Sequence, residues 1–138
     1  MNPLITRNVE HYVRDLFKNN ISGSLLYHDI EHTAYVAEQA RRIGEESGLS
    51  EQEINLAVVA AWFHDSGFVV SVKDHEEEGQ KIAREFLSSQ DISKEEIDQV
   101  LHCIIATKMP QAPGDNMLAR VVCDADMAYL SEPFYFER

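Results

Sequence analysis

Histidine and aspartate side chains occur at three separate points of the chain, each beside apolar residues. His64 and Asp65 end the apolar segment AVVAAWFHD. His32 lies in YHDIEHT, and Asp126 lies in VVCDADMAYL. An ionised carboxylate beside a buried segment costs free energy unless a partner compensates its charge. For His64 or Asp65 taken alone, a helix cap or a hydrogen-bonded core histidine is the commoner explanation, so the case for chemistry depends on all three points together.

Helical spacing places these residues on faces that should point inward. Apolar residues follow His32, precede Asp65 and flank Asp126 at intervals of about three or four; they are Val36, Ala40 and Ile43, then Ile54, Val58 and Ala61, then Val122 and Tyr129. Imidazoles and carboxylates that converge in an apolar core are most simply explained by a metal ion. Two neutral imidazoles and two carboxylates would balance one divalent cation, which could be Mn, Fe, Co, Ni, Mg or Zn. The spacing permits this convergence and does not prove it.

Six helical segments are expected to position these side chains. They cover residues 3–18, 30–46, 51–67, 74–89, 93–104 and 117–130. Ser50 with Glu53, and Ser93 with Glu96, match the capping box of a helix start, while NNISGS should separate the first two helices. VVSV near residue 70 favours a strand but has no partner nearby. We therefore predict one all-α domain over residues 1–138, a compact bundle of about six helices with a metal site in its core.

Charge and cysteine content restrict the partners and the compartment. The formal net charge of −12 comes from 24 acidic and 12 basic residues. Such a field repels a nucleic-acid duplex or an anionic membrane, whereas a metal can still attract a small anion into one cleft. Cys103 and Cys123 lie in apolar runs and favour reduced thiols. The N-terminal residues match neither a signal peptide nor a membrane span, so we expect a cytoplasmic protein.

The order H…HD…D, read as His32, His64–Asp65 and Asp126, resembles the signature of the HD-domain superfamily of metal-dependent phosphohydrolases. YHDIEHT resembles the family segment Y-H-N-x-x-H-[TA], and AAWFHDSG resembles A-A-L-L-H-D-[IT]-G. DHEEEGQKIAREFL resembles the helix H-x-x-x-G-A-x-x-A-x-x-x-L, and DADMAYL resembles A-D-x-L-x-x-L. These four motifs span residues 27–130 in the family's order. The resemblance implies an HD-domain-like bundle and hydrolysis of a phosphoester.

The resemblance also assigns roles. His32, His64, Asp65 and Asp126 match the four ligands of one divalent metal, and Asp65 would also orient or deprotonate the attacking water. His28 matches the histidine that protonates the leaving oxygen in the cyclic-nucleotide branch, although that branch has Asn where this chain has Asp29. In DAD, Asp124 is expected to be a supporting or structural carboxylate.

His75 falls where two-metal branches of the family place a further ligand. Those branches also need a histidine just before a threonine, and this chain has Ala106 before Thr107, with His102 one helical turn earlier. We therefore expect one metal, with His75 binding a substrate phosphate or lying exposed at a helix start. Lys108 could bind the phosphate too, although a solvated loop lysine is the commoner explanation. The run HEEEG predicts a solvated helix start, favoured by the helix dipole.

The predicted substrate is a small phosphoester, most simply a nucleotide. The alternatives are an inactive metal- or nucleotide-binding sensor module and a purely structural helical domain. Relatives continue with more helix after the last ligand. Either the full protein extends beyond this chain, or Phe134, Tyr135 and Phe136 fold back or contact another copy in a homo-oligomer.

Overall fold

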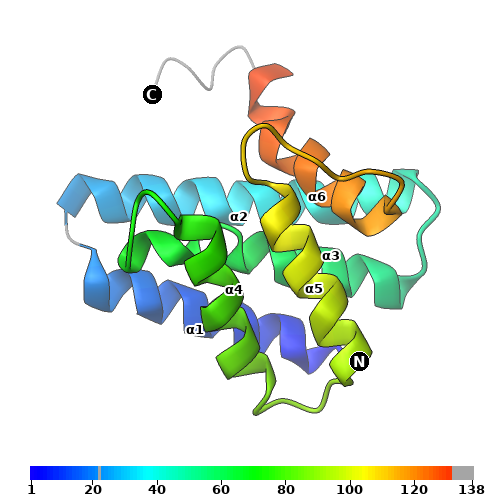
Figure 1. Cartoon of the computed structure of the whole chain (residues 1–138), viewed down its shortest axis with the longest axis horizontal. Coiled ribbons are helices and arrows are strands. Elements are labelled where there is room, and N and C mark those ends of the chain that lie inside the picture. Colours follow the sequence, from blue (N-terminus) through cyan, green and yellow to red (C-terminus); the bar gives the residue numbers. More distant parts are fainter. Residues whose placement is uncertain (22, 132–138) are drawn as a thin grey trace.

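Six α-helices form the protein in this computed structural model (Figure 1). The structure describes residues 1–21 and 23–131, and it describes the side chains of residues 1–21 and 29–130. The helices are α1 (Leu4–Asn20), α2 (Gly23–Glu46), α3 (Glu51–Phe63), α4 (His75–Leu87), α5 (Lys94–Ala106) and α6 (Met117–Met127). Two short 3₁₀ helices, η1 (Ser66–Val69) and η2 (Ala128–Ser131), follow α3 and α6. The described residues contain no strand. The prediction of an all-α bundle of six helices is confirmed.

Helix α3 runs through the centre of the bundle. It packs against α1, α2, α5 and α6, and Figure 1 shows α1 and α2 along its two sides with α4 and α5 crossing in front. Every residue from Ile54 to Phe63 is buried, as expected for a helix that is apolar nearly all round. Because α3 is covered on most sides, the residues that follow its last turn emerge inside the molecule.

Capping interactions fix where α3 begins. The Ser50 hydroxyl accepts a hydrogen bond from the Glu53 backbone N–H at 3.1 Å, and the Glu53 carboxylate accepts one from the Ser50 N–H at 3.0 Å. The same reciprocal pair joins Ser93 and Glu96 before α5. Both predicted capping boxes are confirmed, and each satisfies two donors that a helix start leaves free.

Three predicted boundaries were wrong. Helix α2 begins at Gly23 instead of residue 30, because Gly and Ser are tolerated in a first turn whose N–H groups have no helical partners. Helix α3 ends at Phe63, so His64 and Asp65 lie just beyond it. Helix α6 ends at Met127, and the tighter turn of η2 continues the chain. The strand-like VVSV segment forms no strand, since part of it belongs to η1 and no neighbouring segment pairs with it.

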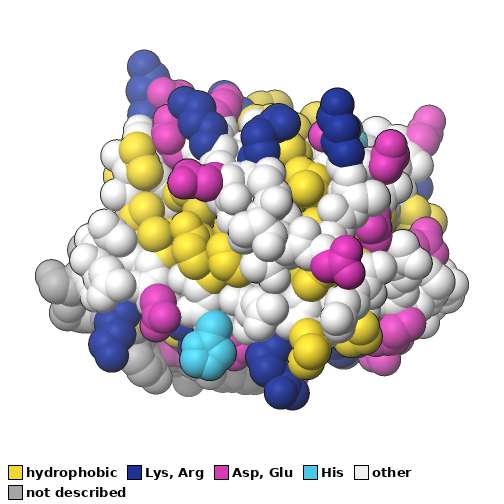
Figure 2. All heavy atoms as spheres, turned by 90° about the horizontal axis from the view of Figure 1, so that it is seen from below, with side chains coloured by type: hydrophobic (Ala, Val, Ile, Leu, Met, Phe, Trp, Pro, Cys, Tyr) yellow, Lys and Arg dark blue, Asp and Glu magenta, His cyan; other side chains and the backbone are white. Residues whose placement is uncertain are grey.

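Charged and apolar side chains are mixed on the surface. Figure 2 shows one face on which hydrophobic side chains gather near the middle and acidic and basic ones surround them. The net charge of −12 is therefore not gathered into one acidic patch on this face. Within the described part of the chain, no helix is both long and apolar enough to cross a membrane. The segment with Phe134, Tyr135 and Phe136 lies outside the described residues.

Candidate metal centre

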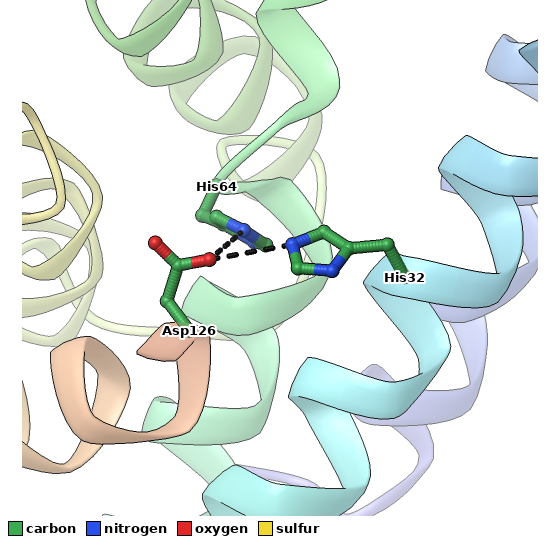
Figure 3. A group of neighbouring side chains, drawn as sticks. All are labelled: His32, His64 and Asp126. Atoms are coloured by element: carbon green, nitrogen blue, oxygen red, sulfur yellow. Dashed lines mark hydrogen bonds and ion pairs between the residues drawn. The ribbon is translucent and has the colours of Figure 1, made fainter. Parts of the chain in front are cut away.

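Three of the four predicted ligands point toward one another from three different elements. His32 comes from α2, His64 directly follows α3, and Asp126 comes from the last turn of α6 (Figure 3). Asp126 Oδ1 lies 3.2 Å from His64 Nε2 and 3.3 Å from His32 Nε2. One ligand atom from each residue lies within 4.8 Å of the other two. The helix packing therefore brings together residues that are up to 94 positions apart in the sequence.

Asp65 also lies close to the same two imidazoles. Its Oδ2 is 3.3 Å from His64 Nε2 and 3.6 Å from His32 Nε2. The backbone of Asp65 leaves the α-helical conformation, with φ −107° and ψ 5°. Because the chain turns here, the side chains of His64 and Asp65 can face the same space although they are neighbours in sequence.

A backbone hydrogen bond determines which nitrogen of His64 is available. His64 Nδ1 lies 2.6 Å from the carbonyl oxygen of Ala61, and a carbonyl only accepts, so Nδ1 carries a proton and donates it. In the neutral ring Nε2 then has only a lone pair, which faces the carboxylates of Asp65 and Asp126. Acceptors facing acceptors at this range need a proton or a cation between them. In a metal-binding histidine, the ring nitrogen that does not bind the metal usually donates its N–H to a carbonyl or carboxylate, as His64 Nδ1 does here.

The spacing of the ligand atoms fits one cation. Neighbouring ligands that each lie about 2.1 Å from a shared ion are roughly 3.0 to 3.4 Å apart. The nitrogen-to-oxygen separations around His64 and His32 run from 3.2 to 3.6 Å. The donor set of imidazole nitrogen and carboxylate oxygen suits transition metals and Mg²⁺. His32, His64 and Asp126 therefore fit the predicted divalent ion, whereas Asp65 lies close to both histidines but outside this group of three.

The charges of the cluster shift its pKa values in opposite directions. Burial alone would lower the pKa of His64, but the neighbouring Asp65 and Asp126 outweigh it and raise the pKa well above its usual range. Burial would raise the pKa of each carboxyl, but the histidines hold both pKa values well below the usual range. Both carboxylates are therefore ionised at neutral pH, as metal ligands must be.

Gln111 was missed by the sequence analysis. Its Nε2 donates a hydrogen bond to Asp126 Oδ2 at 3.0 Å, on the carboxylate oxygen that does not face the histidines. Gln111 lies in the loop of residues 107–116, fifteen positions before Asp126. A polar loop residue at that separation carries no helical periodicity, so no sequence signal pointed to it.

His75 and Glu76 form a second polar group next to Asp65. His75 Nε2 lies 2.9 Å from Glu76 Oε2 and 3.5 Å from Asp65 Oδ1, and the His75 ring stacks on Phe68 with 3.9 Å between centroids. Glu76 is only 6% exposed. The prediction that HEEEG is a solvated helix start is therefore wrong at Glu76, whose carboxylate turns back onto His75. Burial would lower the pKa of His75, but its hydrogen bonds to Asp65 and the Val72 carbonyl raise it.

A glycine permits η1 to lie against the start of α4. A Cβ on Gly67 would come within 1.8 Å of the His75 carbonyl oxygen, which no side chain can do. This close approach brings His75 within reach of Asp65. The position therefore requires glycine for packing, independent of any special backbone angle.

Lys108, His102 and Asp124 have exposed side chains. Lys108 pairs with Glu77 of α4, and both side chains are partly exposed. His102 and Asp124 are exposed on α5 and α6, and no contact recorded for the described residues joins either to the cluster. The role expected for Asp124 stays a prediction. The side chain of His28 lies outside the described residues.

A pocket of about 330 Å³ opens beside the cluster. It is lined by His32, Met109, Asp126, Met127 and Tyr129. Apart from the two candidate ligands its walls are apolar, and the Tyr129 ring meets the His32 ring edge-on at 6.0 Å. A larger groove of about 460 Å³ between α1, α2 and α3 contains none of the predicted site residues.

Comparisons with known proteins agree with this geometry. The family described as HD domain matches residues 26–127, which hold all four candidate ligands. The fold is similar to the crystal structure of a predicted HD superfamily hydrolase from an uncultured Thermotogales bacterium, with a TM-score of 0.72 and 23% identity. That likeness covers 94% of this chain and 74% of the other. No curated protein matches the chain.

Proposed function

The chain belongs to the HD-domain family of metal-dependent phosphohydrolases, and from this premise we propose that it hydrolyses a small phosphoester with one divalent metal ion. We propose a nucleotide as the substrate. The proposed ligands are His32, His64, Asp65 and Asp126.

One observation carries the proposal. Nε2 of the fully buried His64 faces carboxylate oxygens of both Asp65 and Asp126 at 3.2–3.3 Å, while its Nδ1 is occupied by a backbone carbonyl. Without metal, a proton on His64 Nε2 pairs with these carboxylates, and a divalent cation would displace that proton on binding. Imidazole and carboxylate groups that converge from three elements form the donor set that such a cation prefers.

The chain's own residues would divide the chemistry between them. When bound, a divalent cation would lower the pKa of a water molecule toward neutrality and draw charge from a phosphoryl oxygen. Asp65 would orient that water or accept its proton. His28 is our proposed donor of a proton to the leaving oxygen, and His75, beside Asp65, is our proposed donor to a phosphate oxygen.

The substrate's organic part would occupy the pocket beside the cluster. Met109, Met127 and Tyr129 offer apolar and aromatic surface next to His32 and Asp126. A base or another flat apolar group can stack or pack there. Lys108 remains a proposed phosphate contact, although in this structure its amine is engaged by Glu77.

The compartment we propose is the cytoplasm. Cys103 and Cys123 are both free and buried. Reduced buried thiols fit a reducing compartment.

Metal content tests the proposal first. We expect about one equivalent of a divalent metal in the wild type and none in His64→Ala or Asp126→Ala. His11→Ala, which changes an exposed histidine of α1, is the matched control and should keep the metal. Wild-type protein that binds no metal after incubation with Mn²⁺ or Fe²⁺ would contradict the proposal.

Turnover then separates an enzyme from a sensor module. Nucleoside monophosphates, triphosphates, cyclic nucleotides and p-nitrophenyl phosphate are offered to the metal-loaded wild type and to Asp126→Ala. Release of phosphate or nucleoside by the wild type alone supports hydrolysis. Bound metal without turnover of any of these compounds would favour the inactive sensor instead.

A further inference from the structure

The carboxylate of Asp126 is held from two sides. Its Oδ1 faces His32 and His64, and its Oδ2 accepts a hydrogen bond from Gln111 Nε2 at 3.0 Å. A carboxylate only accepts, so the Gln111 amide nitrogen must be the atom that faces it. Gln111 thus occupies the oxygen that the histidines leave free.

We infer that Gln111 is a positioning residue for the metal centre, which it serves by fixing the rotation of the Asp126 carboxylate. This inference rests on the proposed function. Without Gln111 the carboxylate can rotate about its Cβ–Cγ bond, and Oδ1 is no longer held opposite the two imidazoles. Partners that hydrogen-bond a metal ligand in this way set its orientation and strengthen metal binding.

The loop that carries Gln111 is anchored near both of its ends. The Ala112 N–H donates to the Ala106 carbonyl at 3.1 Å, which closes the loop just beyond Gln111. Lys108 pairs with Glu77 of α4, and the Asn116 side chain caps α6 by accepting from the Ala119 N–H at 2.9 Å. The amide of Gln111 is therefore presented to Asp126 by a loop tied to α4, α5 and α6, which reduces the freedom lost when metal binds.

The chain offers a matched glutamine for comparison. Gln80 of α4 is also partly buried, and its Nε2 donates a 2.9 Å hydrogen bond to the Leu101 carbonyl. That bond joins α4 to α5, and neither residue belongs to the metal cluster. Removing either glutamine deletes one hydrogen bond of similar length, but only Gln111 touches a proposed ligand.

Manganese affinity tests the inference directly. The dissociation constant for Mn²⁺ is measured by electron paramagnetic resonance or calorimetry in wild type, Gln111→Met and Gln80→Met. We expect Gln111→Met to bind Mn²⁺ about 10- to 100-fold more weakly, and Gln80→Met to match the wild type. Thermal unfolding monitored by circular dichroism checks that both variants fold.

Two further measurements keep the test decisive. Gln111→Asn keeps an amide on a shorter side chain and replaces Gln111→Met if that variant fails to fold; it should also weaken binding. At saturating Co²⁺, the visible absorption spectrum should change in the Gln111 variants and stay unchanged in Gln80→Met, because the spectrum reports the ligands around the ion.

The results distinguish a failure of the role inferred for Gln111 from a failure of the proposed metal-dependent function. Wild type that binds Mn²⁺ together with an equally tight Gln111→Met would overturn the inference and leave the metal site standing. An equal loss of Mn²⁺ affinity in Gln80→Met would also overturn the inference, since the effect would then come from general weakening of the fold. Wild type that binds no Mn²⁺ would overturn both.

Discussion

The middle of α3 and His64, which directly follows it, are both buried, but their polar groups are satisfied in different ways. From Ile54 to Phe63 the helix buries apolar side chains, and its one polar member, Asn55, accepts a hydrogen bond from Arg41. His64 is just as buried, at 1% exposure, yet its Nε2 faces two carboxylates. The first region is complete without any added group. The second needs a proton on His64 or a bound cation between the imidazole and the carboxylates.

The apolar part of α3 and the polar cluster that follows it should therefore contribute to different properties of the protein. The apolar part of α3 stabilises the bundle by removing apolar surface from water. The cluster after it holds two carboxylates whose pKa values lie well below the usual range, because the ionised groups pair with the neighbouring histidines. Changes in the first region should therefore act on unfolding, and changes in the second on metal binding.

Phe63→Ala should have the largest effect on stability. Phe63 is fully buried between α1 and α4, where it contacts the rings of Tyr12 and Phe86. Truncating a buried phenylalanine removes apolar burial and leaves a cavity, at a cost of about 3–5 kcal/mol. Urea unfolding measures the loss, with the exposed Leu4→Ala as control. If the folded fraction of Phe63→Ala failed to bind metal, the two regions would not be separable as we describe.

Asp126→Asn should have the largest effect on metal binding. The amide keeps the shape of the carboxylate but loses its charge, so Mn²⁺ affinity should fall by more than about 100-fold, beyond the effect of losing a partner of a ligand. Asp124→Asn removes one charge from the exposed face of the same helix and is the control. Calorimetric titration with Mn²⁺ measures both variants. Equal losses in both would mean that net charge, and not ligation, governs binding.

Much of this contrast could be predicted from the sequence, because both regions follow periodic rules. The apolar run of α3 has its own capping signal at Ser50 and Glu53, and both were recognised. His32 and Asp126 lie on apolar helical stripes, and the order of the family motifs placed them with His64. Periodicity specifies which face of a helix points inward, so it permitted the convergence, and the resemblance to the family motifs then selected these residues.

Other features depend on tertiary contacts that no local pattern records. Glu76 is buried because its carboxylate turns onto His75, although acidic residues at a helix start are usually solvated. Gln111 reaches Asp126 from a loop, where no repeat indicates direction. The early start of α2 at Gly23 was missed because NNISGS is rich in turn formers, although Gly and Ser are also tolerated in a first helical turn.

Metal addition should raise the stability of the wild type by an amount set by mass action. At a metal concentration about 100 times the dissociation constant, the free energy of unfolding rises by about 2.7 kcal/mol. Thermal unfolding with and without Mn²⁺ measures the rise, and chelation with EDTA should reverse it. Asp126→Asn should show no such rise, because it lacks the site. A rise of equal size in that variant would place the stabilising ion elsewhere.

Lys108→Met should have the smallest effect and decides what the lysine does. Its amine is paired with Glu77 and is partly exposed, and burial plays little part in that contact. As an anchor of the loop that carries Gln111, it should change Mn²⁺ affinity by less than about threefold, since exposed ion pairs contribute little. If Lys108 instead leaves Glu77 to bind a substrate phosphate, KM for the hydrolysed phosphoester should rise by about tenfold or more while Mn²⁺ affinity stays unchanged.

Glu77→Gln separates the two roles, because it breaks the same pair but leaves the lysine free. If Lys108 is an anchor, both variants should show the same small change in Mn²⁺ affinity. If Lys108 binds the substrate phosphate, KM should rise in Lys108→Met and not in Glu77→Gln.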